Sequence, residues 1–185
     1  RFRFTADLPV LYVTGGALGA TRLNAGIEPN IPDFLERMQI VHQAGPAAAE
    51  NDDTSRLTAF RETLPEHLKQ RYVVTEFVRE ELPDVFAMAD LVVSRSGAGT
   101  VAELELVGKP AILVPLPGTG GDEATKNARV LEKAGAAVMV HQKDATPERL
   151  AQEINRLLTD RAGLATMATN AKTMGRPDAA ARLVD

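Results

Sequence analysis

The sequence predicts an α/β domain in which a parallel six-stranded sheet carries helices on both faces. Short apolar runs rich in β-branched residues recur along the 185-residue chain, and longer stretches with helical spacing separate them. This alternation is typical of βαβ units in a parallel sheet. The length suits one sizeable hydrophobic core, so we expect a single domain over residues 1–185.

The predicted strands are too short and too uniformly apolar to be amphipathic helices. Strands of this kind are expected to be buried on both faces of the sheet. They are Val10–Thr14, Gln39–His42, Tyr72–Thr75, Leu91–Ser94, Ala111–Pro115 and Ala137–Val140.

Helices are predicted between the strands and after the sixth one. The clearest begins after Thr146, which is a good N-cap residue, and has Pro147 in its first turn and an apolar stripe along one face. Gly135 is placed to end the helix before the sixth strand by adopting the left-handed conformation. One or two further helices are expected after Thr159. The others are expected at Ala20–Ile27, Asp33–Arg37, Asp53–Lys69, Pro83–Met88, Thr100–Val107 and Glu123–Lys133.

Composition narrows the classes of function. The formal net charge of −4 gives no broad attraction for a polyanion, so a nucleic-acid partner is not expected. The chain has no cysteine, which excludes disulfides, thiolate metal sites and a cysteine nucleophile and fits a cytoplasmic protein. No apolar run approaches the roughly 18 to 20 residues that span a bilayer, and the N-terminus lacks the pattern of a signal peptide. Because the chain starts at Arg1 rather than at a methionine, we interpret it as a domain excised from a longer protein.

Ligands of open parallel sheets bind beyond the carboxyl ends of the strands, so the loops that follow strands are the first places to search. The loop at residues 14–20 is rich in glycine and leads into a helix. Glycine permits positive φ, and a helix start offers unpaired N–H groups to a phosphate, which makes Gly16, Ala17, Leu18 and Gly19 candidate ligand-binding residues. A plain tight turn explains the loop equally well, because its spacing matches neither the dinucleotide fingerprint nor the Walker loop.

The loop after the fourth strand carries a second glycine-rich turn. Its hydroxyl groups and successive backbone amides would surround a diphosphate. Glu103 follows one turn into the next helix, where it would accept hydrogen bonds from two ribose hydroxyls. Without the loop before it, Glu103 would be interpreted as a solvated helix carboxylate. The candidates here are Arg95, Ser96, Gly97, Ala98, Gly99, Thr100 and Glu103.

A third loop, at residues 115–123, is rich in proline and glycine and ends at Asp122 and Glu123. Carboxylates at a helix start are explained by capping and by the helix dipole. The functional alternative is that these side chains bind sugar hydroxyls. His42 is interpreted as structural because no nucleophile or second metal ligand pairs with it in the sequence. Phe77 would either stack on a base or fill the core, and no role is assigned to the two remaining histidines, His67 and His141.

Together these segments resemble the C-terminal, donor-binding domain of the MurG-like glycosyltransferases, and the resemblance spans nearly the whole chain. The most specific match is the family's SRSGAxTxxE signature at residues 94–103. The other matches are the GGSxGA loop at 15–20, the HQxG turn at 42–45, the TEF segment at 75–77 and the NAxxLEKAGAA ending at 127–137, which adds Asn127 to the candidate binding residues.

The resemblance implies one half of a GT-B fold, in which two Rossmann-like domains face a cleft. It implies a UDP-sugar donor, inversion without a metal or other cofactor, and transfer of N-acetylglucosamine to a lipid-linked acceptor in the synthesis of the peptidoglycan precursor lipid II. Phe77 would lie by the uracil, the main chain of Val78 would bond its edge, and residues 98–103 would wrap the diphosphate and ribose. The acceptor would bind through the missing N-terminal domain, at the cytoplasmic face of the membrane.

Two departures from the family pattern bear on the ligand. Ala17 replaces a serine that binds phosphate, and Glu123-Ala124 replaces a glutamine pair that faces the sugar. No residue of this chain is expected to be catalytic or to bind a metal.

Three alternative functions remain open. They are a related transferase that acts on a glycolipid or natural product, a stand-alone donor-binding subunit that needs a membrane partner, and a Rossmann-type domain for another nucleotide.

Overall fold

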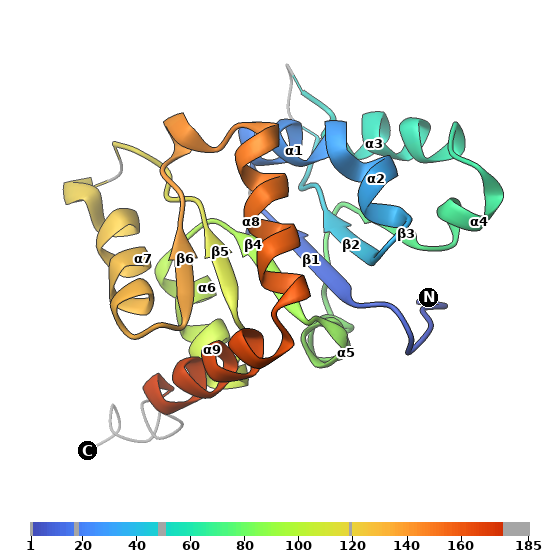
Figure 1. Cartoon of the computed structure of the whole chain (residues 1–185). Coiled ribbons are helices and arrows are strands. Elements are labelled where there is room, and N and C mark those ends of the chain that lie inside the picture. The colour runs from blue at the N-terminus through green and yellow to red at the C-terminus, as the bar shows by residue number, and fades with distance from the viewer. Residues whose placement is uncertain (1, 17–18, 48–50, 119, 176–185) are drawn as a thin grey trace.

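A computed structural model of the chain describes residues 2–16, 19–47, 51–118 and 120–175. Its centre is one six-stranded sheet with the strand order β3-β2-β1-β4-β5-β6 (Figure 1), and all neighbouring strands are parallel. The predicted α/β class and parallel six-stranded sheet are therefore confirmed. The strands are β1 (Val10–Thr14), β2 (Gln39–Gln43), β3 (Tyr72–Thr75), β4 (Leu91–Ser94), β5 (Ala111–Leu113) and β6 (Ala137–Met139).

Two expectations about the strands need correction. The fifth strand ends before Pro115, because proline has no N–H to extend the hydrogen-bond ladder. The residues of β1, β2, β4 and β5 are buried, but β3 and β6 contain half-buried residues such as Val73 and Val138. These two strands lie at the edges of the sheet and have only one neighbour each.

Helices cover both faces of the sheet, as predicted (Figure 1). The single helix expected over residues 53–69 is wrong, because Pro65 adopts an extended conformation and separates α3 from α4. Thr146 caps α8 through a 3.2 Å bond from the Arg149 amide, and Gly135 has a φ of 68°, both as expected. The helices are α1 (Thr21–Ile27), α2 (Ile31–Leu35), α3 (Asp53–Glu62), α4 (Glu66–Lys69), α5 (Leu82–Met88), α6 (Ala98–Val107), α7 (Glu123–Lys133), α8 (Pro147–Thr159) and α9 (Arg161–Met174).

Alternate residues of the strands build two separate cores. Leu11 and Val13 of β1 pack into the core on the face covered by α1, α2 and α8. Val10 and Tyr12 pack into the core on the opposite face, with α5, α6 and α7. Each face of the sheet buries its own apolar layer, so the strands are held rigidly between two sets of helices.

The strand order places the glycine-rich loops next to each other. From β1 the chain runs outward through β2 to β3, and then returns to β4 on the other side of β1. The loops that leave β1 and β4 therefore diverge at a topological switch point, where open parallel sheets bind their ligands. No helix within the part of the chain that the structure describes is long and apolar enough to cross a membrane.

Candidate functional site

The loops after β1 and β4 line the same cavity. This cavity, called the larger cavity below, has a volume of about 780 Å³ and opens at the carboxyl ends of the strands. The structure thus brings together two candidate segments that are about 80 residues apart in the sequence. Its lining includes Gly15, Gly16, Gly19, Arg95, Ser96, Gly97, Ala98, Gly99, Thr100, Leu116 and Glu123 from the predicted loops, Asn127 from the predicted helix that follows, and also Arg22, Ala124 and Gln142.

The start of α6 presents bare backbone to this cavity. Gly97 occupies the N-cap position, and no side chain among the described residues caps the helix. A Cβ added at Gly97 or Gly99 would meet no described atom within 4 Å, so the space above the backbone is open. Uncapped amides and the positive end of the helix dipole favour an anion at this place.

The first glycine loop is a tight turn as well as a cavity wall. Gly16 and Gly19 have φ values of 76° and 71°, and a Cβ at Gly19 would lie 2.8 Å from the carbonyl oxygen of Ala44. The amide of Gly19 donates to the carbonyl of Gly16 at 3.2 Å. The positive φ and the close approach to Ala44 alone thus explain why residue 19 is a glycine. Ala17 and Leu18 lie outside the described residues.

Two arginines give the larger cavity a positive wall. The guanidinium of Arg95 donates to the carbonyl of Val114 at 3.1 Å and to Oε1 of Gln142 at 2.8 Å. Burial and the nearby charge of Arg22 lower the pKa of Arg95. Neither arginine forms a salt bridge with a described carboxylate. Sequence reasoning missed Arg22, and its place in the first turn after the glycine loop was the available signal.

Ser96 and Asn127 tie the second glycine loop to α7. Ser96 is fully buried and donates its hydroxyl proton to the carbonyl of Ala124 at 2.7 Å. The amide of Asn127 donates to the carbonyl of Ser96 at 3.2 Å. Ser96 therefore uses its proton to hold the cavity walls together, whereas Asn127 commits one N–H to Ser96 and keeps its second N–H and its oxygen without a described partner.

A smaller cavity of about 320 Å³ adjoins the larger one. It shares Gly16, Gly99 and Thr100 with the larger cavity and is otherwise lined by other residues, which include Phe77, Val78 and Glu103. Glu103 thus faces the crevice between the two loops and is not a fully solvated helix carboxylate. Its pKa is raised by desolvation.

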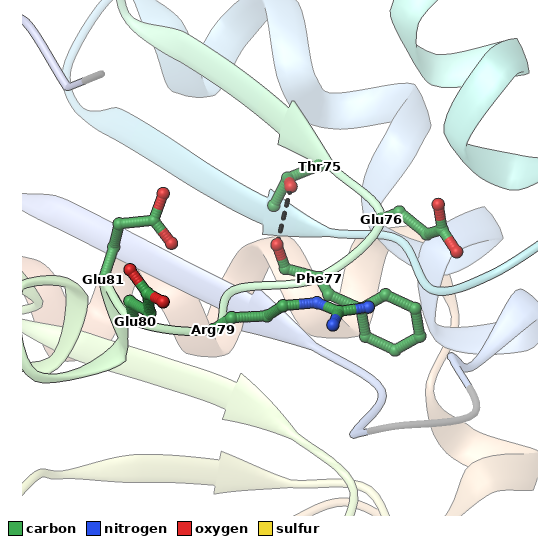
Figure 2. Close-up of a pocket in the computed structure, with 6 residues that line it drawn as sticks. All are labelled: Thr75, Glu76, Phe77, Arg79, Glu80 and Glu81. Carbon is green, nitrogen blue, oxygen red and sulfur yellow. Dashed lines mark hydrogen bonds between the residues drawn. The ribbon is translucent and has the colours of Figure 1, made fainter.

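Phe77 lies on the loop after β3 and belongs to neither hydrophobic core of the described residues. This placement argues against the interpretation of Phe77 as core filling. The guanidinium carbon of Arg79 lies 5.4 Å from the ring centroid, and Figure 2 shows Arg79 reaching back along the loop to the ring. Thr75 fixes the turn through a 2.9 Å bond from its hydroxyl to the Phe77 carbonyl. Such an arrangement holds an aromatic ring at the rim of the smaller cavity.

The backbone amide of Val78, expected at the edge of a bound base, has a partner within the protein. It donates to Oε1 of Gln43 at 3.0 Å. Gln43 ends β2 and was not predicted as a site residue. Its place in the HQxG turn at residues 42–45 was the available signal, but its bonding partners become apparent only in the structure.

His42 is structural, as expected from the sequence. It is completely buried, with Nε2 3.0 Å from Oδ1 of Asn24 and Nδ1 3.1 Å from the hydroxyl of Tyr72. The Asn24 amide group donates to Ala44 and Asp53, so its oxygen faces His42, and Nε2 must carry the proton. Burial lowers the pKa of His42 to about 4, which keeps the ring neutral.

The two carboxylates at the start of α7 have different environments. Glu123 lines the larger cavity, but Asp122 lines neither cavity. Asp122 adopts a left-handed φ of 62° and makes no side-chain bond to a helix amide among the described residues. Its carboxylate accepts instead from the hydroxyl of Thr125 at 2.7 Å. Of the two explanations for Asp122, a capping bond to a helix amide is therefore not found among the described residues.

A parallel sheet with amides and arginines around a crevice at its switch point is typical of Rossmann-like domains. Residues 10–183 match the model of the glycosyltransferase family 28 C-terminal domain, and the chain belongs to this family.

Relatives and solved structures agree with this assignment. The chain is 43% identical over 180 residues to the UDP-N-acetylglucosamine–N-acetylmuramyl-(pentapeptide) pyrophosphoryl-undecaprenol N-acetylglucosamine transferase of Rhodopseudomonas palustris strain BisA53, covering 95% of this chain and 45% of that protein. The crystal structure of Acinetobacter baumannii MurG superposes with a TM-score of 0.79 at 32% identity, covering 98% of this chain and 50% of that one. The chain spans about half the length of these relatives.

A more distant structural neighbour bears on the fold alone. It is the glycosyltransferase SnogD from Streptomyces nogalater, with a TM-score of 0.63 at 20% identity, covering 98% of this chain and 45% of that one.

Proposed function

We propose that this domain binds the UDP-sugar donor of an inverting hexosyltransferase. The reaction we favour is the transfer of N-acetylglucosamine from UDP-N-acetylglucosamine to a lipid-linked acceptor in lipid II synthesis. The observation that carries the proposal is the meeting of two cavities at Gly16, Gly99 and Thr100, with arginines on one side and Glu103 on the other. The family and the name of the Rhodopseudomonas palustris relative support it.

The two cavities suit the parts of a nucleotide sugar in order. The diphosphate would lie where the cavities meet, against the amides at the start of α6 and near the charge of Arg95. Glu103 would accept hydrogen bonds from ribose hydroxyls, and Phe77 and Val78 would contact the base in the smaller cavity. The sugar would extend toward Glu123 in the larger cavity.

This placement gives the domain a chemical role beyond binding. Inverting transfer leaves negative charge on the diphosphate as the bond to the sugar breaks. Fixed amides and a fixed guanidinium directed at that charge stabilise it without reorganising. We propose that the attacking hydroxyl of the acceptor and its base come from another domain, so that residues 1–185 form a single donor domain without a catalytic side chain.

The cellular setting follows from the acceptor. A lipid-linked acceptor implies work at the inner face of the cell membrane, where we propose that the whole protein acts as a peripheral, cytoplasmic enzyme. A stand-alone donor-binding subunit with a membrane partner would meet the same requirement.

A related transferase with another donor sugar or acceptor is the second candidate. The observation that favours it is Glu123, a carboxylate that lines the cavity where the sugar would lie. Its neighbour Ala124 has no polar group on its side chain, and its carbonyl accepts the bond from Ser96. Sugar selection would then rest on Glu123 and Asn127.

Calorimetric titration with UDP and with NAD tests the proposed class of ligand. We expect UDP to bind and NAD to bind far more weakly. Comparison of UDP-N-acetylglucosamine with UDP-glucose then separates the two candidate functions by the sugar that is preferred. Clear NAD binding without UDP binding would overturn the proposal.

A matched pair of variants ties the ligand to the cavity. Glu103→Gln should weaken UDP binding, whereas Glu66→Gln, at an exposed position on α4, should leave it unchanged. Equal behaviour of the two variants would mean that Glu103 does not contact the bound nucleotide.

A further inference from the structure

Gln43 joins the two loops that would hold the two ends of a nucleotide. Its side chain is 6% exposed and makes three hydrogen bonds at the end of β2. Oε1 accepts from the amide of Val78 at 3.0 Å and from the hydroxyl of Tyr12 at 3.1 Å. Nε2 donates to the carbonyl oxygen of Gly16 at 3.1 Å.

The orientation of this amide group is fixed by its partners. The Val78 N–H only donates and the Gly16 carbonyl only accepts, so the oxygen and nitrogen of Gln43 cannot exchange places. Burial and the nearby charge of Glu103 raise the pKa of Tyr12 to about 12, which keeps its hydroxyl protonated and available as a donor. Gln43 therefore bridges an amide donor on one loop and a carbonyl acceptor on the other.

The two loops have different proposed ligands. Val78 follows Phe77 on the loop after β3, which lines the smaller cavity, where the base would bind. Gly16 belongs to the loop after β1, where the smaller and larger cavities meet. Apart from the strands beneath them, Gln43 is the side chain that bonds directly to both loops among the described residues. A change at this position would let each loop move independently of the other.

We propose that Gln43 is a positioning residue that sets the separation between the nucleobase site and the diphosphate site. It acts through the backbone of Val78 and Gly16, so it supports both sites without supplying the contact that recognises either part of the nucleotide. The inference rests on the proposed nucleotide-binding function, and it adds a residue and a role that this function does not require.

Gln39 provides a matched control at the other end of β2. It is also buried, at 1% exposed, and its amide bonds Thr5 and Leu8, far from the cavities along the strand. Gln43→Met and Gln39→Met remove the same chemical group from the same strand with similar side-chain volume. The two variants differ in whether the lost bonds connect the ligand loops.

The experiment measures uridine and pyrophosphate separately, by NMR titration of the purified protein. We expect Gln43→Met to weaken both ligands, by roughly fivefold each, a loss typical of one hydrogen bond. Gln39→Met should leave both affinities unchanged. Weakening of uridine alone would indicate direct contact with the base and overturn the proposal, as would unchanged affinities or equal losses in the two variants.

A second variant tests the bonds of Gln43 to Val78 and to Gly16 separately. It also keeps the proposal testable if Gln43→Met does not fold. Gln43→Glu keeps the acceptor for Val78 but, when ionised, has no donor for the Gly16 carbonyl. We expect a loss of pyrophosphate affinity with uridine affinity retained, and the reverse pattern would contradict the role. Wild-type protein that binds no UDP refutes the proposed function instead, so the two failures are distinguishable.

Discussion

Acidification is expected to destabilise the protein through His42. The pKa of this ring is lowered to about 4 by burial in the folded state, against 6.5 for an ordinary histidine. Between these values the unfolded chain holds a proton that the folded protein does not, so stability falls as the pH falls. The full difference corresponds to about 3 kcal/mol, of which about 2 kcal/mol is lost between pH 7 and pH 5.

Urea denaturation at a series of pH values measures this loss. The comparison variant is His42→Gln, whose amide can still donate to Asn24 and accept from Tyr72 but does not titrate in this range. The wild type should lose about 2 kcal/mol more than this variant between pH 7 and pH 5. His141→Gln, at an exposed histidine, should keep the wild-type loss. Equal pH dependence in the wild type and His42→Gln would refute the reasoning.

Four further substitutions test the site. Glu103→Gln should weaken UDP binding about tenfold in calorimetry, because a charge-assisted bond to the ribose is lost. An unchanged affinity would mean that Glu103 is a solvated helix carboxylate that does not contact the ribose. Gly19→Ala should lower the free energy of unfolding by about 1 to 3 kcal/mol, since the φ of Gly19 is positive. Gly99→Ala should raise the free energy of unfolding by about 0.5 kcal/mol, because Gly99 is a helical residue of α6 with open space for a Cβ. Ser96→Ala should cost about 1 kcal/mol in urea denaturation by leaving the Ala124 carbonyl without its donor, and a more stable variant would contradict this.

The sheet was predictable because its signals are local. In the run at residues 91–94, three consecutive apolar residues precede Ser94, and such an unbroken apolar stretch indicates a strand buried on both faces. The meeting of the two glycine loops was also predictable, because the carboxyl ends of parallel strands share one edge. The break at Pro65 was a local signal that the interpretation of residues 53–69 as one helix overlooked.

The contacts inside the site were not predictable in the same way. Gln43 meets Val78 and Gly16, which are 35 and 27 residues away, and nothing in the sequence marks these pairs. Ser96 was expected to bind phosphate from its place in a glycine loop, but its proton goes to a helix carbonyl 28 residues further on. Residue type and spacing indicate where polar groups gather, and tertiary packing decides which of them remain free.

The fixed guanidinium of Arg95 has a consequence for how an anion arrives. Two of its N–H groups are held by neutral oxygens of Val114 and Gln142, so the side chain is already ordered while its charge stays unneutralised by any described carboxylate. An incoming phosphate ester that approaches this guanidinium therefore meets a fixed positive charge, although the net charge of the chain is −4. Such a field acts at a distance and accelerates the encounter, so added salt should slow association more than it hastens release.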